Sequence, residues 1–159
     1  RPVIGDFKFG GVIFYIDESG EHGLVCTVTD QSTGAPWGCV GTVITGADDR
    51  TVGAGPQNTL DILAECATEG IAAYICDTLT HNGFNDWYLP SYDELVLIYE
   101  NKNTINTTLA LVGAPLVEDR YWSSTEYNST GSLAKYLNTG VESARRKDLN
   151  AYVRAIRTF

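Results

Sequence analysis

The chain of 159 residues has a hydrophobic share of 43% and 16 glycines, which suits one domain with its own core and many turns. Its net charge of −9 argues against nucleic acid as a partner. It contains no run of about 18 apolar residues, so we expect no part of it to span a membrane.

The first predicted element is a hairpin near the N-terminus. Residues 9–16 form an apolar strand and residues 24–29 form the return strand. Gly20 and Gly23 suit the turn between them, because glycine accepts the positive φ angles that tight turns need.

A long loop is predicted over residues 30–55, in which only residues 40–44 are apolar enough for a short strand. Loops of this length are usually functional or pinned by a bond or a metal. Asp48 and Asp49 leave a calcium site open there, although their spacing does not match an EF-hand loop. We expect no other cofactor.

A first helical region is predicted within residues 58–80. Asn58 or Thr59 can cap its N-terminus, since both side chains can accept a hydrogen bond from a free backbone N–H. Gly70 is expected to end or kink it. The predicted buried stripe consists of Leu60, Leu63 and Ala67, with Cys66 beside it.

A second helix is predicted over residues 91–101. Ser91 and Glu94 have the spacing of a capping box, in which the two residues satisfy each other's free backbone N–H groups. Its buried stripe is expected to consist of Leu95, Ile98 and Tyr99. Residues 103–119 read as a loop.

The tail is rich in aromatic and β-branched residues at both ends, which is typical of strands. We expect an antiparallel sheet that includes residues 120–124 and 152–158. Residues that flank the motif turns or occupy apolar strand positions are predicted to be buried: Trp87, Leu89, Trp122, Val153 and Ile156.

Between these strands lies a polar stretch that we predict to be a ligand-binding face. Tyr, Asn, Ser and Arg dominate it, and these residue types form contact surfaces. The alternative is an ordinary solvated meander. The predicted contact residues are Tyr127, Asn128, Ser129, Tyr136, Asn138, Glu142, Arg145, Arg146, Asn150 and Tyr152, with Tyr127, Tyr136 and Arg145 as the leading anchors.

The charge of the chain is unevenly distributed. Residues 121–159 hold six of the 11 basic side chains and three of the 20 acidic ones, so a mildly basic tail follows an acidic body. The run Arg145-Arg146-Lys147 is the basic cluster of this tail. Arg154 and Arg157 could instead pair with carboxylates of the body.

Four cysteines are present, none of them in a CxxC pair, so the spacing of a zinc site is absent. Four cysteines allow three pairings, and buried free thiols are the alternative. We favour a disulfide between Cys39 and Cys66, because it would tie the long loop to the first helix. The chain starts at Arg1 and contains no methionine, so we expect one domain, residues 1–159, from a longer surface protein.

Seven short motifs follow one another along the chain: Gly10-Gly11-Val12-Ile13-Phe14, His22-Gly23-Leu24-Val25, Asp30-Gln31-Ser32-Thr33-Gly34, Trp37-Gly38-Cys39, Asp86-Trp87-Tyr88-Leu89-Pro90-Ser91, Tyr121-Trp122-Ser123-Ser124-Thr125-Glu126 and Val153-Arg154-Ala155-Ile156-Arg157. Each motif alone is weak, whereas their order and spacing over nearly the whole chain are specific. In this combination the chain closely resembles the bacterial family called DUF1566, or the Lcl C-terminal domain.

The resemblance implies an α+β fold like that of C-type lectins, with two helices on mixed antiparallel sheets. The family is named for a collagen-like adhesin, so the resemblance also implies a secreted or cell-surface binding module. Related domains serve as variable proteins of diversity-generating retroelements, and the span that matches their varied positions is residues 127–152.

Enzymes on the same fold provide an alternative function. Formylglycine-generating enzymes use a cysteine pair late in the chain, and here no cysteine follows Cys76. Iron enzymes on this fold use several histidines, and here only His22 and His81 exist. We therefore expect no enzymatic activity, with a degenerate enzyme of the formylglycine-generating type as the minor alternative.

The expected partner is a glycan or a protein on another cell or host surface. Calcium-dependent sugar lectins of this fold carry Glu-Pro-Asn or Gln-Pro-Asp followed by Trp-Asn-Asp, and neither motif is present. Sugar binding would therefore use aromatic stacking and Asn or Arg contacts without a metal. A purely structural role, as a capping domain or a homotrimerising domain, is the remaining alternative.

Overall fold

A computed structural model describes all of residues 1–159 as a mixed α+β domain with two sheets and four helices. The helices are α1 (Gly55–Glu65), α2 (Ala72–Asp77), α3 (Tyr92–Glu100) and α4 (Lys102–Val112). The strands are β1 (Phe7–Lys8), β2 (Gly11–Ile16), β3 (Gly23–Cys26), β4 (Ser32–Pro36), β5 (Arg120–Glu126), β6 (Gly131–Tyr136), β7 (Glu142–Arg146), β8 (Asn150–Val153) and β9 (Ile156–Thr158). None of the helices combines the length and the apolar composition that crossing a membrane requires.

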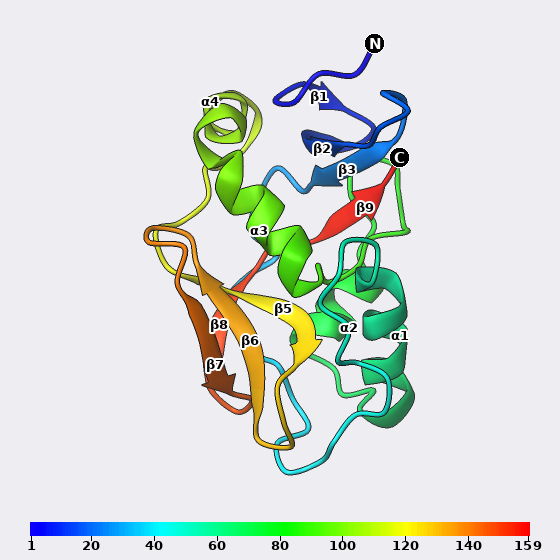
Figure 1. The fold of residues 1–159 in the computed structure, drawn as a ribbon, viewed down its shortest axis with the longest axis vertical. Coiled ribbons are helices and arrows are strands. Elements are labelled where there is room, and N and C mark those ends of the chain that lie inside the picture. The colour runs from blue at the N-terminus through cyan, green and yellow to red at the C-terminus, as the bar shows by residue number, and fades with distance from the viewer.

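The two sheets lie at opposite ends of the molecule, with α3 between them (Figure 1). One sheet has the order β1-β2-β3-β9 and the other has the order β4-β8-β5-β6-β7. Both chain termini lie at the four-stranded sheet, and the loops at the far end of the five-stranded sheet face away from them (Figure 1). The predicted α+β class is confirmed, with four helices where two were expected.

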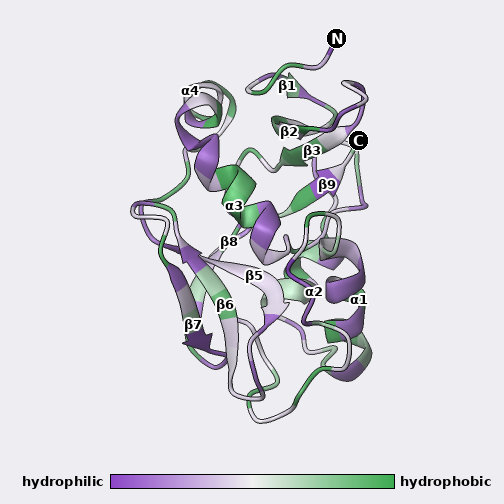
Figure 2. Ribbon diagram, viewed as in Figure 1, coloured by the Kyte–Doolittle hydropathy of each residue, from purple (hydrophilic) through white to green (hydrophobic).

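Two apolar clusters form the core. The first joins α1, α2 and the five-stranded sheet around Trp37 and Trp122, and the second joins α3, α4 and the four-stranded sheet around Phe14. Figure 2 shows the corresponding hydrophobic colouring in β2, β3 and part of α3, whereas β7 ends in hydrophilic residues. The predicted core is confirmed, because the five predicted residues are at most 2% exposed: Trp87, Leu89, Trp122, Val153 and Ile156.

The capping box at the start of α3 is confirmed. The backbone N–H of Glu94 donates to Ser91 Oγ at 3.3 Å, and Glu94 Oε1 accepts from the backbone N–H of Ser91 at 2.8 Å. Leu95 and Ile98 face the core as predicted, and Tyr99 is half-buried. The sequence alone predicts this capping box because Ser91 and Glu94 lie within one helical turn of each other.

The first helix begins three residues earlier than predicted. Pro56 occupies its first turn, where a fixed φ angle favours the helix, and Ala54 is the N-cap. Asn58 and Thr59 are buried on the inner face, because Asn58 Nδ2 donates to the carbonyl of Asp49 and Thr59 Oγ1 accepts from the backbone of Leu89. The predicted stripe is wrong at two positions, because Leu60 is 55% exposed and Ala67 lies exposed beyond the end of α1, whereas Ile62 is buried. The predicted helical region is divided into two helices, α1 and α2, and Gly70 lies between them with a φ of 91°.

The loop prediction for residues 103–119 was wrong over most of α4. Its threonines and asparagines have low helix propensity, which favoured a loop reading. Ile105 and Leu109, four residues apart, are both fully buried in the core cluster that contains Phe14 of β2. Tertiary packing of this stripe therefore overrides the local preference.

The strand predicted over residues 40–44 is absent, and β4 forms earlier in the same loop. Cys39 and Gly41 have φ angles of 56° and 93°, which interrupt an extended run. Strand β4 contains a glycine and a proline, which weaken a sequence signal, but its pairing with β8 holds it extended.

One antiparallel sheet was predicted for the tail, but its strands belong to both sheets of the domain and include one parallel pairing. Strands β5, β6 and β7 pair antiparallel, whereas β8 meets β5 in parallel through Tyr121 and Tyr152. Strand β9 leaves this sheet and pairs with β3. The break between β8 and β9 falls at Arg154 and Ala155, both buried, so the tail joins the two sheets.

Candidate ligand-binding surface

Two arginines of the tail serve the fold. Arg154, 1% exposed, donates to Asp30 Oδ1 at 2.9 Å and to the carbonyl of Thr27 at 2.9 Å. Arg157 donates to both carboxylate oxygens of Asp86, at 2.6 and 3.1 Å. Neither guanidinium is free for a ligand, so the alternative in which both pair with body carboxylates is confirmed.

The motif around Trp122 is also internal. The indole N–H of Trp122 donates to the carbonyl of Ala35 at 2.7 Å, and that of Trp37 donates to the carbonyl of Ser123 at 2.9 Å. The hydroxyl of Thr125 donates to the carbonyl of Asp49 at 3.0 Å. These bonds fix the long loop against β5, and they place the motif residues in the framework beneath the surface.

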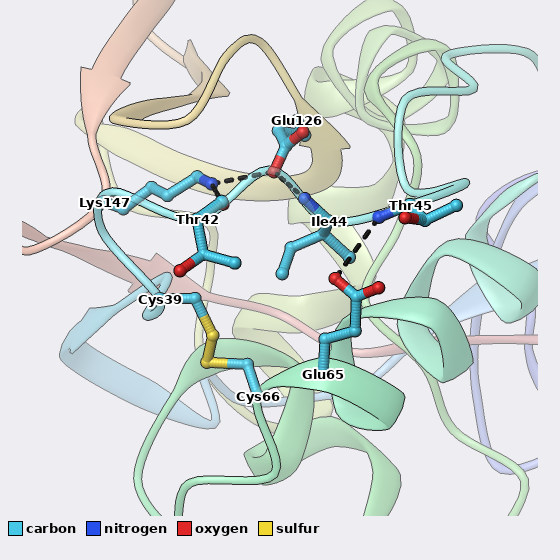
Figure 3. Close-up of a disulfide and its surroundings, with 8 residues drawn as sticks. All are labelled: Cys39, Thr42, Ile44, Thr45, Glu65, Cys66, Glu126 and Lys147. Atoms are coloured by element: carbon cyan, nitrogen blue, oxygen red, sulfur yellow. Dashed lines mark hydrogen bonds and ion pairs between the residues drawn. A yellow bond between two sulfur atoms is a disulfide. The ribbon is translucent and has the colours of Figure 1, made fainter.

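A buried ion pair lies at the end of β5. Lys147 Nζ donates to Glu126 Oε2 at 2.7 Å and to the carbonyl of Thr42 at 2.9 Å (Figure 3). The same carboxylate oxygen accepts from the backbone N–H of Ile44 at 2.8 Å. Lys147 also lies over the ring of Trp37, 4.8 Å from its centroid. Lys147 is therefore not part of a basic surface, and the predicted basic cluster is reduced to its two arginines.

The predicted disulfide between Cys39 and Cys66 is present, with the two Cα atoms 5.9 Å apart. It joins the loop after β4 to the end of α1 (Figure 3). The backbone N–H of Thr45 adds a longer contact to Glu65 Oε2, at 3.4 Å. The disulfide and the buried ion pair thus hold residues 39–45 from two sides.

These bonds create a surface that we call the loop end. The backbone N–H of Gly41 donates to the carbonyl of Ser129 at 2.7 Å, and that of Lys147 donates to the carbonyl of Thr130 at 2.8 Å. Residues 39–45, 127–130 and 147–149 are therefore tied together. The loop end consists of the large apolar side chains that these three segments leave exposed: Val40, Val43, Tyr127 and Leu149.

A second surface, the arginine group, lies on the five-stranded sheet. The Cζ atom of Arg120 lies 5.2 Å from the centroid of the Tyr136 ring, and Arg145 Nε donates to the carbonyl of Asn150 at 2.9 Å. Burial, and then the neighbouring charge of Arg120, lowers the pKa of Arg145 from its usual value. The arginine group consists of Arg120, Tyr136, Arg145, Asn150 and Tyr152.

The arginine group borders a small polar cavity of about 200 Å³. Asp119 forms a long contact with Arg120 at its edge, 3.6 Å between Oδ1 and Nε. The residues that line the cavity are Thr33, Asp119, Arg120, Asn150, Ala151 and Tyr152.

The ten predicted contact residues thus divide between two surfaces and a remainder. Tyr127 and Ser129 belong to the loop-end segments, where Asn128 uses its side-chain oxygen to cap the turn through the backbone N–H groups of Thr130 and Gly131. Tyr136, Arg145, Asn150 and Tyr152 belong to the arginine group.

The side chains of the remaining three predicted residues have partners within the protein. Glu142 accepts from Arg50 Nη2 at 2.9 Å, and Arg146 pairs with Asp148 at 2.8 Å. Asn138 accepts from the backbone N–H of Thr139. Sequence reasoning missed Val40, Val43, Arg120 and Thr33, because only the folded chain brings them beside the predicted stretch, and it passed over Leu149 within that stretch.

The two aspartates considered for calcium have ordinary roles in the structure. Asp49 Oδ1 accepts from the backbone N–H and the hydroxyl of Thr51, at 2.9 and 2.7 Å, which stabilises the turn before α1. Asp48 lies exposed. The structure contains no group of three or more His, Cys, Asp or Glu residues arranged so that they could hold a metal ion.

Comparison with known proteins gives a fold and a family. A fimbrial protein from Bacteroides ovatus ATCC 8483 has a similar structure, with a TM-score of 0.61 and 19% sequence identity over 84% of this chain. The chain spans 35% of the length of that protein. No curated protein matches the sequence. The family model of the Lcl C-terminal domain matches residues 26–157, and the chain belongs to that family.

Proposed function

We propose that this chain is a non-enzymatic, adhesin-like module of a bacterial cell surface, which binds a glycan or a protein through the exposed face of residues 127–152. The observation that carries the proposal is the loop end. Val43 and Tyr127 are each 62% exposed, yet the segments that bear them are held by a disulfide and a buried ion pair. Rigid, exposed apolar and aromatic side chains favour binding, because little conformational freedom is lost on contact.

The arrangement of the molecule supports this role. The loop end lies at the opposite end of the domain from both termini (Figure 1). A disulfide supports a place outside the cytoplasm, either secreted or at the cell surface, since disulfides persist in oxidising compartments.

The two free cysteines and His81 support a function other than catalysis. Cys26 and Cys76 are fully buried, and burial raises the pKa of both thiols, that of Cys26 to about 11. Reactive cysteines have lowered pKa values and some exposure. His81 Nε2 accepts a long hydrogen bond from the backbone N–H of Val28, so this imidazole serves the fold.

A binding comparison on printed glycans and immobilised surface proteins tests the proposal. The double variant Val43→Ala/Tyr127→Ala removes the most exposed part of the loop end. We expect it to lose binding while its melting temperature stays within about 2 °C of the wild type, because both side chains are exposed. Leu111→Ala is the matched control, since Leu111 is 84% exposed on α4, away from the loop end. Full binding by the double variant would contradict a site at the loop end.

A structural role makes a different prediction for the same surface. If the loop end packs against further copies of the chain, as in a homotrimer, the wild type should have a multiple of its 17.3 kDa mass in solution. Sedimentation measurements of the wild type and the double variant distinguish the two roles. The structural role would be favoured if the wild type is an oligomer that binds no ligand and the double variant is a monomer.

A further inference from the structure

We infer that the cavity between β2, β3, β9 and the loop before α1 binds a lysine side chain of a partner protein. This site is separate from the proposed face of residues 127–152. It lies at the four-stranded sheet, at the opposite end of the domain from the loop end (Figure 1). The cavity has a volume of about 240 Å³, and its lining consists of Tyr15, Asp17, His22, Gly23, Leu24, Val52, Gly53 and Thr158.

The first step is the apolar surface of the cavity. Tyr15 is the cross-strand neighbour of Leu24, and Leu24 is in turn the neighbour of Thr158, so these residues form a row across β2, β3 and β9. Neighbours of this kind share one face of a sheet. Val52, 43% exposed, adds an apolar side chain from the loop before α1. An aliphatic chain can therefore pack along the lining.

The second step is the one acidic residue of the lining, Asp17. Its Oδ1 accepts from the backbone N–H and from the hydroxyl of Ser19, whereas its Oδ2 has no hydrogen-bond partner in the protein. Asp17 also takes part in no ion pair. The hydroxyl of Thr158 is already engaged, 3.0 Å from that of Tyr88. The cavity thus combines apolar surface with one free carboxylate oxygen.

The third step is the kind of cation that fits this combination. A lysine side chain places an aliphatic stem on apolar surface and a compact ammonium at its end. A guanidinium instead prefers to meet both oxygens of a carboxylate, and Ser19 already occupies one oxygen of Asp17. The volume lies below the roughly 300–1,000 Å³ of pockets for drug-sized ligands, so the cavity suits a single side chain.

The fourth step is the charge around the cavity. Glu18 and Glu21 lie exposed in the same turn between β2 and β3 as Asp17, and neither forms an ion pair. The Arg1 guanidinium lies close to Gly20 in this turn but pairs with none of the three carboxylates. The whole chain has a net charge of −9. A basic segment of a partner therefore matches this turn, because complementary charges steer association.

Titration of the whole chain with the acetylated and amidated peptide Gly-Gly-Lys-Gly-Gly, followed by NMR, tests the inference. A pH of about 7.5 keeps ordinary histidine side chains mostly neutral. We expect the backbone amide signals of Gly23, Leu24 and Gly53 to shift on binding. Asp17→Asn should weaken binding by about threefold to fivefold, as expected for a partly exposed ion pair. The asparagine oxygen can still accept from Ser19, so the turn should be kept.

Two further variants show whether the cavity itself is responsible. Val52→Ala should also weaken binding, because the lysine stem loses apolar contact. Glu21→Gln is the matched control, since Glu21 lies exposed in the same turn and carries the same charge but does not line the cavity. It should change the affinity by less than about twofold, because salt screens exposed charges. An equal loss in Glu21→Gln and Asp17→Asn would overturn the inference.

Three comparison peptides decide the ligand chemistry. Norleucine or acetyl-lysine in place of lysine keeps an aliphatic stem without the charge, so both peptides should bind at least about threefold more weakly. The peptide with arginine should bind no more tightly than the peptide with lysine. Equal binding of the norleucine peptide, tighter binding of the arginine peptide, or no shift at the three amides would overturn the inference.

The loop-end variant Val43→Ala/Tyr127→Ala separates this site from the proposed face. It should bind the lysine peptide like the wild type, because neither residue lines the cavity. Asp17→Asn should in turn keep the binding to glycans or surface proteins that the wild type shows. Loss of lysine binding in the loop-end variant would contradict a separate site, whereas loss of array binding alone leaves the lysine site standing.

Discussion

At the scale of single residues, the tail uses its polar groups in two different ways. The charges of Arg154, Arg157 and Lys147 are each matched by a carboxylate and by backbone carbonyls, so they hold segments far apart in sequence. Breaking the buried pairs of Arg154 and Lys147 from one side is strongly destabilising, because the partner charge stays buried alone. Arg145 and Lys135 differ, because neither forms an ion pair with a carboxylate: Arg145 donates to the carbonyl of Asn150, and Lys135 donates to the carbonyl of Gly140.

Ser132 on β6 has a polar group that no other group of the protein satisfies. Its hydroxyl is fully buried and has no hydrogen-bond partner. An unsatisfied buried hydroxyl costs about 1–3 kcal/mol, so Ser132→Ala should raise the free energy of unfolding by about 1 kcal/mol.

Urea denaturation of Ser132→Ala and of Ser123→Ala checks this prediction. Ser123 provides the control, because its hydroxyl donates to the carbonyl of Leu133 at 2.6 Å and accepts from the backbone N–H of Thr125. Ser123→Ala should lower the free energy of unfolding by about 1–3 kcal/mol. A loss of similar size in Ser132→Ala would mean that its hydroxyl is hydrogen-bonded in the protein.

At the scale of elements, helix α4 is held against the core by the buried side chains of Ile105 and Leu109. Leu109 is fully buried, whereas Leu111, two residues on, is 84% exposed on the same helix. Leu109→Ala should lower the free energy of unfolding by about 2–5 kcal/mol, because it leaves a cavity in the core. Leu111→Ala should change it by less than about 0.5 kcal/mol. Similar small effects for both variants would be incompatible with a packed helix at this position.

The elements that could be predicted from the sequence are those stabilised by residues close to one another in the chain. The capping box of α3 and the hairpin of β2 and β3 depend on partners within a few residues. Strand β4 and helix α4 depend on β8 and on the core, which no local pattern contains. The candidate site divides in the same way. Tyr127 was recognisable as an exposed aromatic residue, whereas the burial of Lys147 arises only in the folded chain.

The segment that carries Val40 and Val43 depends on the disulfide for its position. Replacement of both Cys39 and Cys66 by serine should lower the free energy of unfolding by about 2–4 kcal/mol, because the unfolded chain gains freedom. Thermal melts should show that dithiothreitol destabilises the wild type and has no effect on the double variant. Titration of the unfolded, unreduced wild type should find only the thiols of Cys26 and Cys76. Four free thiols would show that the bond does not form.

At the scale of the whole molecule, the tail takes part in both sheets, which α3 also contacts. Strands β5 to β8 belong to one sheet and β9 belongs to the other, so residues 120–158 cross both core clusters. Arg154 and Arg157 reinforce this crossing from within, through Asp30 and Asp86. The loop end and the arginine group both depend on the same sheet, so they should keep their geometry together.

The Arg157–Asp86 pair makes part of this stability sensitive to acid. Hydrogen bonds from Arg157 lower the pKa of Asp86 below its usual value in the folded protein. The folded state therefore binds fewer protons than the unfolded state near pH 4. The contribution of the pair is complete above the unfolded pKa of about 3.9, and it is lost as the pH falls through the lower folded pKa.

Measuring the free energy of unfolding of Asp86→Asn and of the wild type at several pH values tests the direction of this pH dependence. At pH 7 the variant should be less stable by no more than about 1 kcal/mol, because the Asp86 side chain is 57% exposed and solvent screens the pair. The difference should shrink as the pH falls below about 3.9 and through the lowered pKa of Asp86 in the folded state, since protonation removes the same charge from the wild type. Asp148→Asn is the control, because Asp148 pairs with the exposed Arg146 at the end of β7 and joins no distant elements. A difference between Asp86→Asn and the wild type that grows on acidification would contradict a lowered pKa for Asp86 in the folded state.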